Sequence, residues 1–251
     1  MTADHAPIEL SWEWRPSKRN PVIRFSIESV AVGAGSADDP DNRIAASGFQ
    51  ETMAKFPLNM EWFDHFDQMS RCRRGSQDFW AFDLEQSNPA AKAYFFPRDG
   101  IETLSKTITT APHCTSDKLK AWNVFRNFAE RSFAEHNTVN VFMVSIDLLD
   151  PEQSRTKIYF RDSRSSFAYV IENMTLGGRI SDQRTDAGLR RIRKLWDAFF
   201  GQEHALNTAS LPYVRHPTAG ILYLAEFRLG IHYRRSRYIC RSDIMPAMIF
   251  T

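Results

Sequence analysis

Residues 142–161 read FMVSIDLLDPEQSRTKIYFR, and this stretch decides the fold. Polar and apolar residues alternate from Arg155 to Arg161, which predicts a β-strand with its two faces in different surroundings. An apolar run rich in strand-forming residues precedes it, and a polar segment around Pro151 separates the two. The stretch therefore predicts two strands joined by a turn, which normally pair as antiparallel neighbours.

An earlier stretch, residues 79–97, follows the same plan and reads FWAFDLEQSNPAAKAYFFP. Both stretches contain an Asp-Leu pair, a connection with a proline and a Lys-X-Tyr-Phe motif. The two motif lysines are Lys92 and Lys157. Their separation of about 65 residues is typical of a repeated supersecondary unit.

Further strands extend the repeat in both directions. The segments Ile8–Trp14 and Val22–Val30 form an earlier pair, with Arg24 placed close to one period before the first motif lysine. Residues 220–227 form a later strand, in which Tyr223 lies close to one period after the tyrosine of the second motif. The same period therefore relates all of these strands.

Apolar residues at helical spacing fill the intervals between the strand pairs. The predicted helices span residues 43–54, 59–71, 101–109, 116–133, 165–174 and 182–200. Each unit therefore reads ββαα, and successive units predict an α+β fold in which helices cover one face of an antiparallel sheet.

The other face of the sheet is cationic and aromatic. Residues two apart in a strand share a face, so Arg155, Lys157, Tyr159 and Arg161 point the same way. Lys92, Tyr94 and Phe96 repeat this arrangement in the earlier unit, and Arg24 falls at the corresponding place in the first.

Two interpretations of this face stay open from the residues alone. Lys, Arg and Tyr are ordinary occupants of a sheet face in water. If the sheet closes into a barrel, the face becomes a lumen, where converging cations need a polyvalent anion such as a diphosphate. Interleaved tyrosines would then supply π faces for a carbocation.

Composition limits the partners. The 251 residues contain 32 Lys+Arg and 30 Asp+Glu, a net charge of +2 that gives no overall field for nucleic acid or an anionic membrane. The three cysteines lie far apart and lack the spacing of metal ligands, so the sequence predicts neither disulfide bonds nor a zinc site. It also has neither a signal-peptide pattern nor an apolar stretch long enough to span a membrane. We expect a cytoplasmic protein without nucleic-acid or membrane partners.

Several of these stretches together resemble the fungal dimethylallyltryptophan synthase family of aromatic prenyltransferases, from about residue 8 to about residue 230. The resemblance implies a closed antiparallel barrel of ββαα units with helices outside and catalysis in its lumen. The stretches that carry it are IELS (8–11), VIRF (22–25), FDL (82–84), KAYFFP (92–97), KIY (157–159) and MTLGGR (174–179).

The resemblance also implies an activity, the transfer of a dimethylallyl group from its diphosphate to an aromatic acceptor such as tryptophan or an indole diketopiperazine. Glu9 would accept a hydrogen bond from the indole N–H and orient the ring. The residues that would hold the diphosphate are Arg24, Lys92, Arg155 and Lys157, and those that would shield the allylic cation are Tyr94, Tyr159 and Tyr223.

No resident metal or other cofactor is expected. Helical isoprenoid enzymes bind diphosphate through magnesium on a DDxxD motif, and this sequence has none. Its nearest counterpart, Asp38-Asp39-Pro40-Asp41, lies among Gly and Ser residues, and Pro40 favours a turn. Lys and Arg would neutralise the diphosphate instead.

Two departures from the family pattern lead us to expect an incomplete barrel. Family members have a further helical segment before the strand of Glu9, and 251 residues hold fewer than four units. After residue 230 the family continues with a strand resembling YIPVRHY. Synonymous codons for residues 237–245 can be chosen so that a shifted frame spells IYLPVRHY. We therefore expect one prenyltransferase domain over residues 1–230, with residues 231–251 an atypical tail from a frameshift or mispredicted splice.

Two hypotheses of function follow. The first is an aromatic prenyltransferase of fungal alkaloid or secondary metabolism. The second is a non-catalytic partial barrel that binds an anionic or aromatic ligand or pairs with another chain through its open edges, which also leaves a homodimer open.

Overall fold

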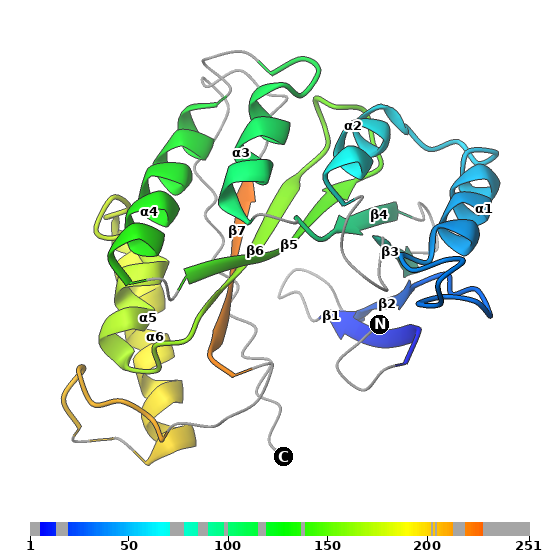
Figure 1. Ribbon diagram of the computed structural model, residues 1–251. Coiled ribbons are helices and arrows are strands. Elements are labelled where there is room, and N and C mark those ends of the chain that lie inside the picture. The colour runs from blue at the N-terminus through cyan, green and yellow to red at the C-terminus, as the bar shows by residue number, and fades with distance from the viewer. Residues whose placement is uncertain are drawn as a thin grey trace.

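The computed structural model describes residues 6–13, 20–70, 78–84, 90–97, 100–114, 119–136, 139–201, 203, 205–212 and 219–227. The expected tail, residues 231–251, lies outside the described residues. Within these ranges the chain forms one antiparallel sheet with helices against one of its faces (Figure 1).

Among the described residues the sheet has seven strands in chain order, each paired antiparallel with the next. This confirms the predicted antiparallel sheet. The strands are β1 (Ile8–Glu13), β2 (Val22–Ile27), β3 (Asp78–Leu84), β4 (Ala90–Phe95), β5 (Val139–Asp147), β6 (Thr156–Asp162) and β7 (Ile221–Phe227).

Two helices follow each strand pair, which confirms the ββαα unit. The helices are α1 (Arg43–Met53), α2 (Glu61–Ser70), α3 (Ile101–Thr109), α4 (Lys120–His136), α5 (Phe167–Met174) and α6 (Gln183–Phe200). Their bounds differ from the predicted ones by a few residues at the ends. Each described helix is too short or too polar to cross a membrane.

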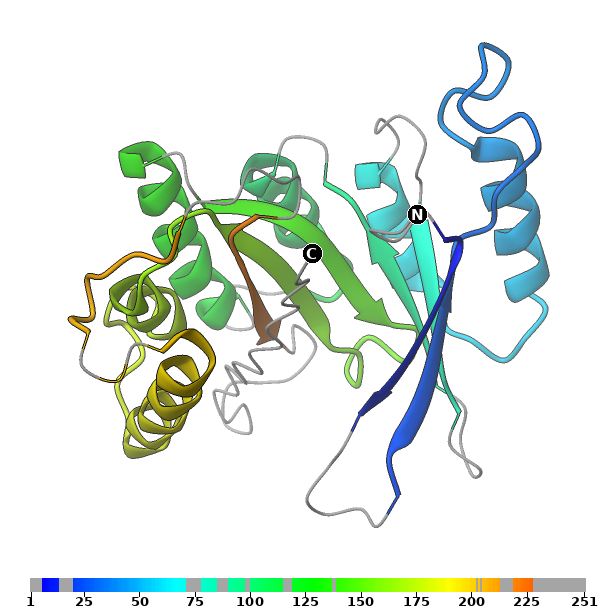
Figure 2. The same ribbon diagram turned by 90° about the horizontal axis from the view of Figure 1, so that it is seen from below.

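The helices α2 and α4 pack on the hairpins that follow them. Helix α2 contacts β4, and α4 contacts β5 and β7. In Figure 2 the curled sheet is seen with these helices on its outer side. We call the side of the sheet away from the helices the concave face.

Aromatic side chains fill the layer between the sheet and its helices. The ring of Phe63 lies 4.8 Å from that of Trp80, and the ring of Phe125 lies 5.3 Å from that of Phe160. Each of these four side chains is almost fully buried. Burial of large rings is the main stabilisation of this layer, at about 25 cal/mol per Å² of apolar surface.

The acidic run, residues 38–41, lies in the loop before α1, and one of its aspartates stabilises the start of this helix. Asp39 accepts hydrogen bonds from the backbone N–H groups of Arg43, at 2.6 Å, and of Ile44, at 3.4 Å. These N–H groups have no partner within the first helical turn, so a carboxylate there stabilises the helix. Pro40 and Asp41 form a turn, which confirms the predicted turn.

Strand β5 departs from strict alternation at one point. Val141 pairs with Phe160 and Met143 pairs with Tyr159, so Phe142 is an extra residue in β5. Such a β-bulge allows two successive side chains to lie on the same face. Phe142 and Met143 both join an aromatic cluster on the concave face, whereas period-two alternation would separate them.

Candidate active site

The concave face carries the charged residues that the sequence predicts. Strand register places Arg24 of β2 beside Asp83 of β3, and Lys92 of β4 beside Asp147 of β5. Lys157 of β6 lies beside Glu226 of β7. Cations and carboxylates therefore alternate from strand to strand across the middle of the sheet.

Asp83 joins two of the predicted cations. Arg24 Nε donates a hydrogen bond to Asp83 Oδ1 at 2.5 Å, and Lys92 Nζ donates to Asp83 Oδ2. Lys92 is 1% exposed although it is charged. A buried ammonium is stable only with an acceptor close by, so Asp83 fixes the place of both cations.

The other two predicted cations are held by two further carboxylates. Arg155 Nε donates to Asp147 Oδ2 at 2.5 Å, and its Nη2 donates to Oδ1 at 3.3 Å. Glu226 Oε2 lies 3.8 Å from Arg155 Nη1 and 3.7 Å from Lys157 Nζ. The four predicted cations and these three carboxylates together leave one positive charge.

Burial and pairing shift the pKa values of this group. Burial opposes the ionisation of Asp83, but hydrogen bonds from Arg24 and Lys92 overcome it and lower its pKa to about 2. Burial lowers the pKa of Lys92, and it lowers the pKa of Lys157 with a further contribution from Arg155. A negatively charged ligand beside these lysines would favour their protonated forms.

Two of the predicted tyrosines lie together beside the cations. The ring centroids of Tyr94 and Tyr159 are 6.1 Å apart. Both side chains are largely buried, and burial raises the pKa of each phenol, so both stay neutral near pH 7. They border the aromatic cluster on the concave face, which is made of Phe79, Ala81, Tyr94 and Phe96 with Phe142, Met143 and Tyr159 packed against it.

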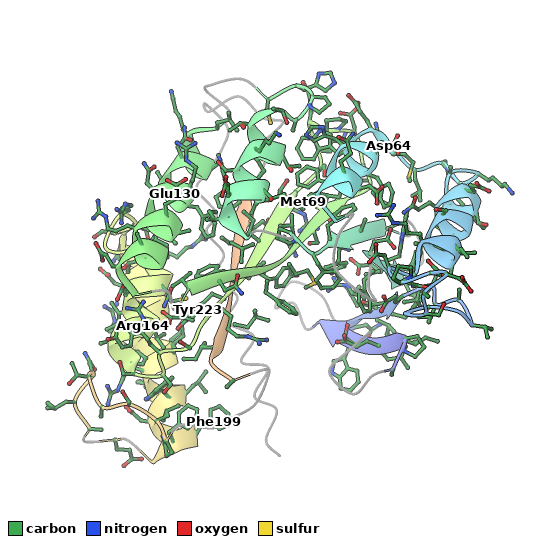
Figure 3. The ribbon with its side chains drawn as sticks, viewed as in Figure 1. Asp64, Met69, Glu130, Arg164, Phe199 and Tyr223 are labelled. Atoms are coloured by element: carbon green, nitrogen blue, oxygen red, sulfur yellow. The ribbon has the colours of Figure 1, made fainter. Side chains whose placement is uncertain are left out.

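Tyr223 lies on the opposite side of the sheet. Its partner across the strands is Phe160, and the two rings stack at 5.3 Å in the layer beneath the helices. Figure 3 labels Tyr223 and Arg164 on the side of the sheet that faces α4 and α5. The resemblance groups Tyr223 with Tyr94 and Tyr159 as shields of the allylic cation, but the structure places Tyr223 on the other face of the sheet, because the residue beside Tyr159 is Leu224.

Glu9 lies on the same face as the cations but at its edge. Glu9 is exposed on β1 and pairs with Ser26 of β2. Ser26 pairs in turn with Ala81 of β3, and Ala81 pairs with Lys92 of β4. Three strand spacings separate Glu9 from Lys92, or about 14 Å between backbones. An acceptor ring between them would have Glu9 on one side and the cations on the other.

The carboxylates Asp83, Asp147 and Glu226 are site residues that the sequence analysis did not assign. A signal for two of them was present, since both belong to the repeated Asp-Leu pairs and lie one period apart. Repetition of an acid beside repeated cations is a sign of ion pairing. Glu226 had no such signal, since it lies in a single strand beyond the repeated pairs.

The arrangement can bind a polyvalent anion. An ammonium carries three N–H donors, and a single carboxylate oxygen takes one of those of Lys92. Guanidinium and ammonium groups held by neighbouring carboxylates keep their positions before a ligand arrives, so little reorganisation is needed when negative charge develops. Among the described residues, no group of three or more His, Cys, Asp or Glu side chains is placed to hold a metal ion.

Comparison with protein families gives one match along nearly the whole chain. The model of the family described as tryptophan dimethylallyltransferase matches residues 1–237. The chain is 30% identical over 252 aligned positions to a 4-O-dimethylallyl-L-tyrosine synthase of Claviceps purpurea, covering 92% of this chain and 56% of that protein. It is 29% identical to a 7-dimethylallyltryptophan synthase of Aspergillus fumigatus, covering 98% of this chain and 59% of that protein.

Solved structures share the fold. AnaPT from Neosartorya fischeri superposes with a TM-score of 0.72 at 24% identity, over 92% of this chain and 59% of that one. NotF in complex with brevianamide F and DMSPP superposes with a TM-score of 0.75 at 21% identity, over 92% of this chain and 61% of that one. The chain thus spans between a half and two thirds of the length of these relatives.

Proposed function

Because this chain belongs to the tryptophan dimethylallyltransferase family, we propose that it is an aromatic prenyltransferase that moves a dimethylallyl group from its diphosphate to an indole- or tryptophan-type acceptor. The curated relatives support this reaction, since two of them are named as dimethylallyltransferring synthases of tyrosine and tryptophan. We place the reaction in fungal alkaloid or secondary metabolism and in the cytoplasm.

The observation that carries the proposal is the convergence of four cations on the concave face next to a tyrosine pair. The carbon–oxygen bond of the allylic diphosphate breaks with both electrons leaving on oxygen. Arg24, Lys92, Arg155 and Lys157 stabilise the diphosphate as this charge develops, which lowers the barrier to ionisation. This requires no metal ion, and none is proposed.

The tyrosine pair protects the other product of ionisation. The π faces of Tyr94 and Tyr159, 6.1 Å apart, stabilise the allylic cation and keep water from it. Glu9 accepts a hydrogen bond from the acceptor N–H and orients the ring. The ring then forms the new carbon–carbon bond with the allylic cation, and the proton on the attacked carbon passes to the released diphosphate or to water, which restores aromaticity.

The test uses the purified chain with dimethylallyl diphosphate and L-tryptophan, with and without EDTA, and detects product by mass spectrometry. We expect product in both conditions. Lys157→Ala should lower kcat/KM at least about 100-fold, since it removes a charged contact made to the leaving group. Lys194→Ala, an exposed lysine on α6, is the matched control and should keep full activity.

Failure has a distinct outcome. A folded chain, shown by circular dichroism, that gives no product with tryptophan, tyrosine or an indole diketopiperazine would instead support a non-catalytic binding module. The proposed shifted frame in the tail is tested separately, since genomic sequence across codons 237–245 either encodes IYLPVRHY in that frame or does not. A chain carrying that strand should be more active, because the strand would extend the sheet beyond β7 and further enclose the reacting groups.

A further inference from the structure

A fifth cation lies on the concave face, at a distance from the other four. Arg161 follows Lys157 and Tyr159 at alternate positions of β6, so all three share this face. Four positions along the strand separate it from Lys157, or about 13 Å. In the strand register Arg161 pairs with Asn140 of β5 and with Leu222 of β7.

The bulge in β5 gives Arg161 an aromatic support. The guanidinium carbon of Arg161 lies 5.1 Å from the centroid of the Phe142 ring. Phe142 in turn packs edge-on against Phe96, with ring centroids 5.9 Å apart. Because Phe142 is the extra residue of the bulge, the backbone irregularity is what brings this ring beneath the guanidinium.

The surroundings of Arg161 make it a strong site for a carboxylate. The side chain is half-buried, and burial lowers the pKa of its guanidinium, which nevertheless stays charged near pH 7. A planar guanidinium binds a carboxylate through two parallel hydrogen bonds. Partial exclusion of water strengthens the attraction between the two charges.

The aromatic cluster lies between Arg161 and the four other cations. Tyr94 and Tyr159 border those cations, and Phe142 borders Arg161. A ligand that carries an aromatic ring and a carboxylate at its other end can therefore lay the ring on the cluster and reach Arg161. A ligand without a carboxylate gains only the first contact.

We propose that Arg161, supported by Phe142, binds the carboxylate of the acceptor and so makes the enzyme selective for free aromatic amino acids. This rests on the proposed function, because it assigns one end of the same acceptor site. Selectivity would come from geometry, since the two cationic regions lie at opposite ends of the aromatic cluster and each takes a different anion.

The test compares L-tryptophan with tryptamine, which has the same ring but no carboxylate. Calorimetric binding and KM are measured for both, with the wild type and with Arg161→Gln. We expect the wild type to prefer L-tryptophan and the variant to lose about 10- to 100-fold of its affinity for L-tryptophan, the range of a hydrogen bond between charged groups. Affinity for tryptamine and KM for dimethylallyl diphosphate should stay within about twofold.

Two further variants separate recognition from folding. Arg161→Lys keeps the charge without the planar fork, so it should recover part of the preference for L-tryptophan and is used if the Gln variant does not fold. Arg190→Gln, on the exposed surface of α6, should change neither ligand's affinity. Equal weakening of both ligands in Arg161→Gln, or a wild type without preference for L-tryptophan, overturns the proposal.

The outcomes also distinguish this proposal from the proposed reaction. Prenylation of tryptamine and L-tryptophan with equal KM values would keep the prenyltransferase and overturn the role of Arg161. Binding that depends on Arg161 and on the carboxylate, without any prenylated product, would support this subsite and overturn the reaction.

Discussion

The β3–β4 and β5–β6 hairpins have the same sequence plan but use their carboxylates differently. In the first, Asp83 binds the motif lysine of its own hairpin, Lys92, and also Arg24 of β2. In the second, Asp147 binds Arg155, which precedes the motif lysine by two positions. That lysine lies beside Glu226 of β7 instead.

The difference shows which features the repeat itself sets in each hairpin and which depend on the strands beside that hairpin. The repeat sets the backbone and places a cation on the concave face of each hairpin. The ion pairs then depend on the strand that lies alongside, β2 in one case and β7 in the other. In the first hairpin Asp83 binds two cations, and one of these, Lys92, is almost fully buried, so this hairpin should be the more sensitive to loss of its carboxylate.

The largest effect is expected when the shared carboxylate is removed. Asp83→Ala should lower the free energy of unfolding by about 3–5 kcal/mol, because it leaves the buried charge of Lys92 without its partner. Asp147→Ala should cost less, about 1–2 kcal/mol, since the side chain of Arg155 is 28% exposed and keeps Glu226 nearby. Urea denaturation at pH 7 measures both.

A double variant tests the cause. Asp83→Ala combined with Lys92→Met removes both buried charges and should recover much of the lost stability. If the double variant is no more stable than Asp83→Ala, the loss comes from packing, and the contrast between the hairpins does not depend on the ion pair.

A second effect concerns the helix-facing side, where β3 begins with a carboxylate and β5 is apolar. Asp78 is 2% exposed, and burial raises its pKa to about 7, with Asp67 and Glu28 adding to the shift while the amide of Gln50 opposes it. The folded state therefore holds this proton more tightly than the unfolded state, so its contribution to stability is full below pH 4 and is lost as the pH rises to about 7.

Asp78→Asn should remove this loss. We expect the variant to match the wild type at pH 4 and to be more stable at pH 8 by about 2–4 kcal/mol. The upper value corresponds to a pKa raised by about three units, at about 1.36 kcal/mol for each unit. Urea denaturation from pH 4 to 8 gives the two profiles. Asp186→Asn on the surface of α6 is the control, and a variant less stable than the wild type at pH 8 would contradict the assignment.

The smallest effect tests the bulge, which β5 has and the pairing of β3 with β4 lacks. Phe142→Ala should lower the free energy of unfolding by about 1–2 kcal/mol, because the ring is only half-buried. Deleting Phe142 restores regular alternation while Val141 and Met143 keep their faces, so it should cost about the same. Thermal unfolding followed by circular dichroism compares the two, and a much larger cost for the deletion would mean that the bulge has a structural role of its own.

Much of this architecture could be predicted from the sequence because its signals are local. Helical spacing and period-two alternation indicated the elements, and the repeat indicated their order. Alternation alone placed Arg155, Lys157 and Tyr159 on one face. In the structure Lys157 and Tyr159 occupy alternate positions of β6, and Arg155 contacts the same carboxylate, Glu226, as Lys157 does. Where polar and apolar residues alternate, the pattern itself identifies which face is which.

The position of Tyr223 could not be predicted in this way. Strand β7 reads ILYLAEF, in which only Glu226 is charged, so its two faces differ at a single position and the alternation is a weak guide to which residues face the helices. Counting one period from Tyr159 aligned the two tyrosines, but the pairing is one position out of step and sets Leu224 beside Tyr159. A shift of a single position exchanges the faces of a strand.

The sequence by itself determined the ββαα units, the antiparallel sheet and the cationic residues of its concave face, because each depends on neighbours within a few positions of the chain. Only the tertiary structure decided the carboxylate partners, the face of Tyr223 and the meeting of Phe142 with Arg161. These depend on the register between strands that are distant in sequence and on a single extra residue in β5, and register is set by packing across the whole sheet.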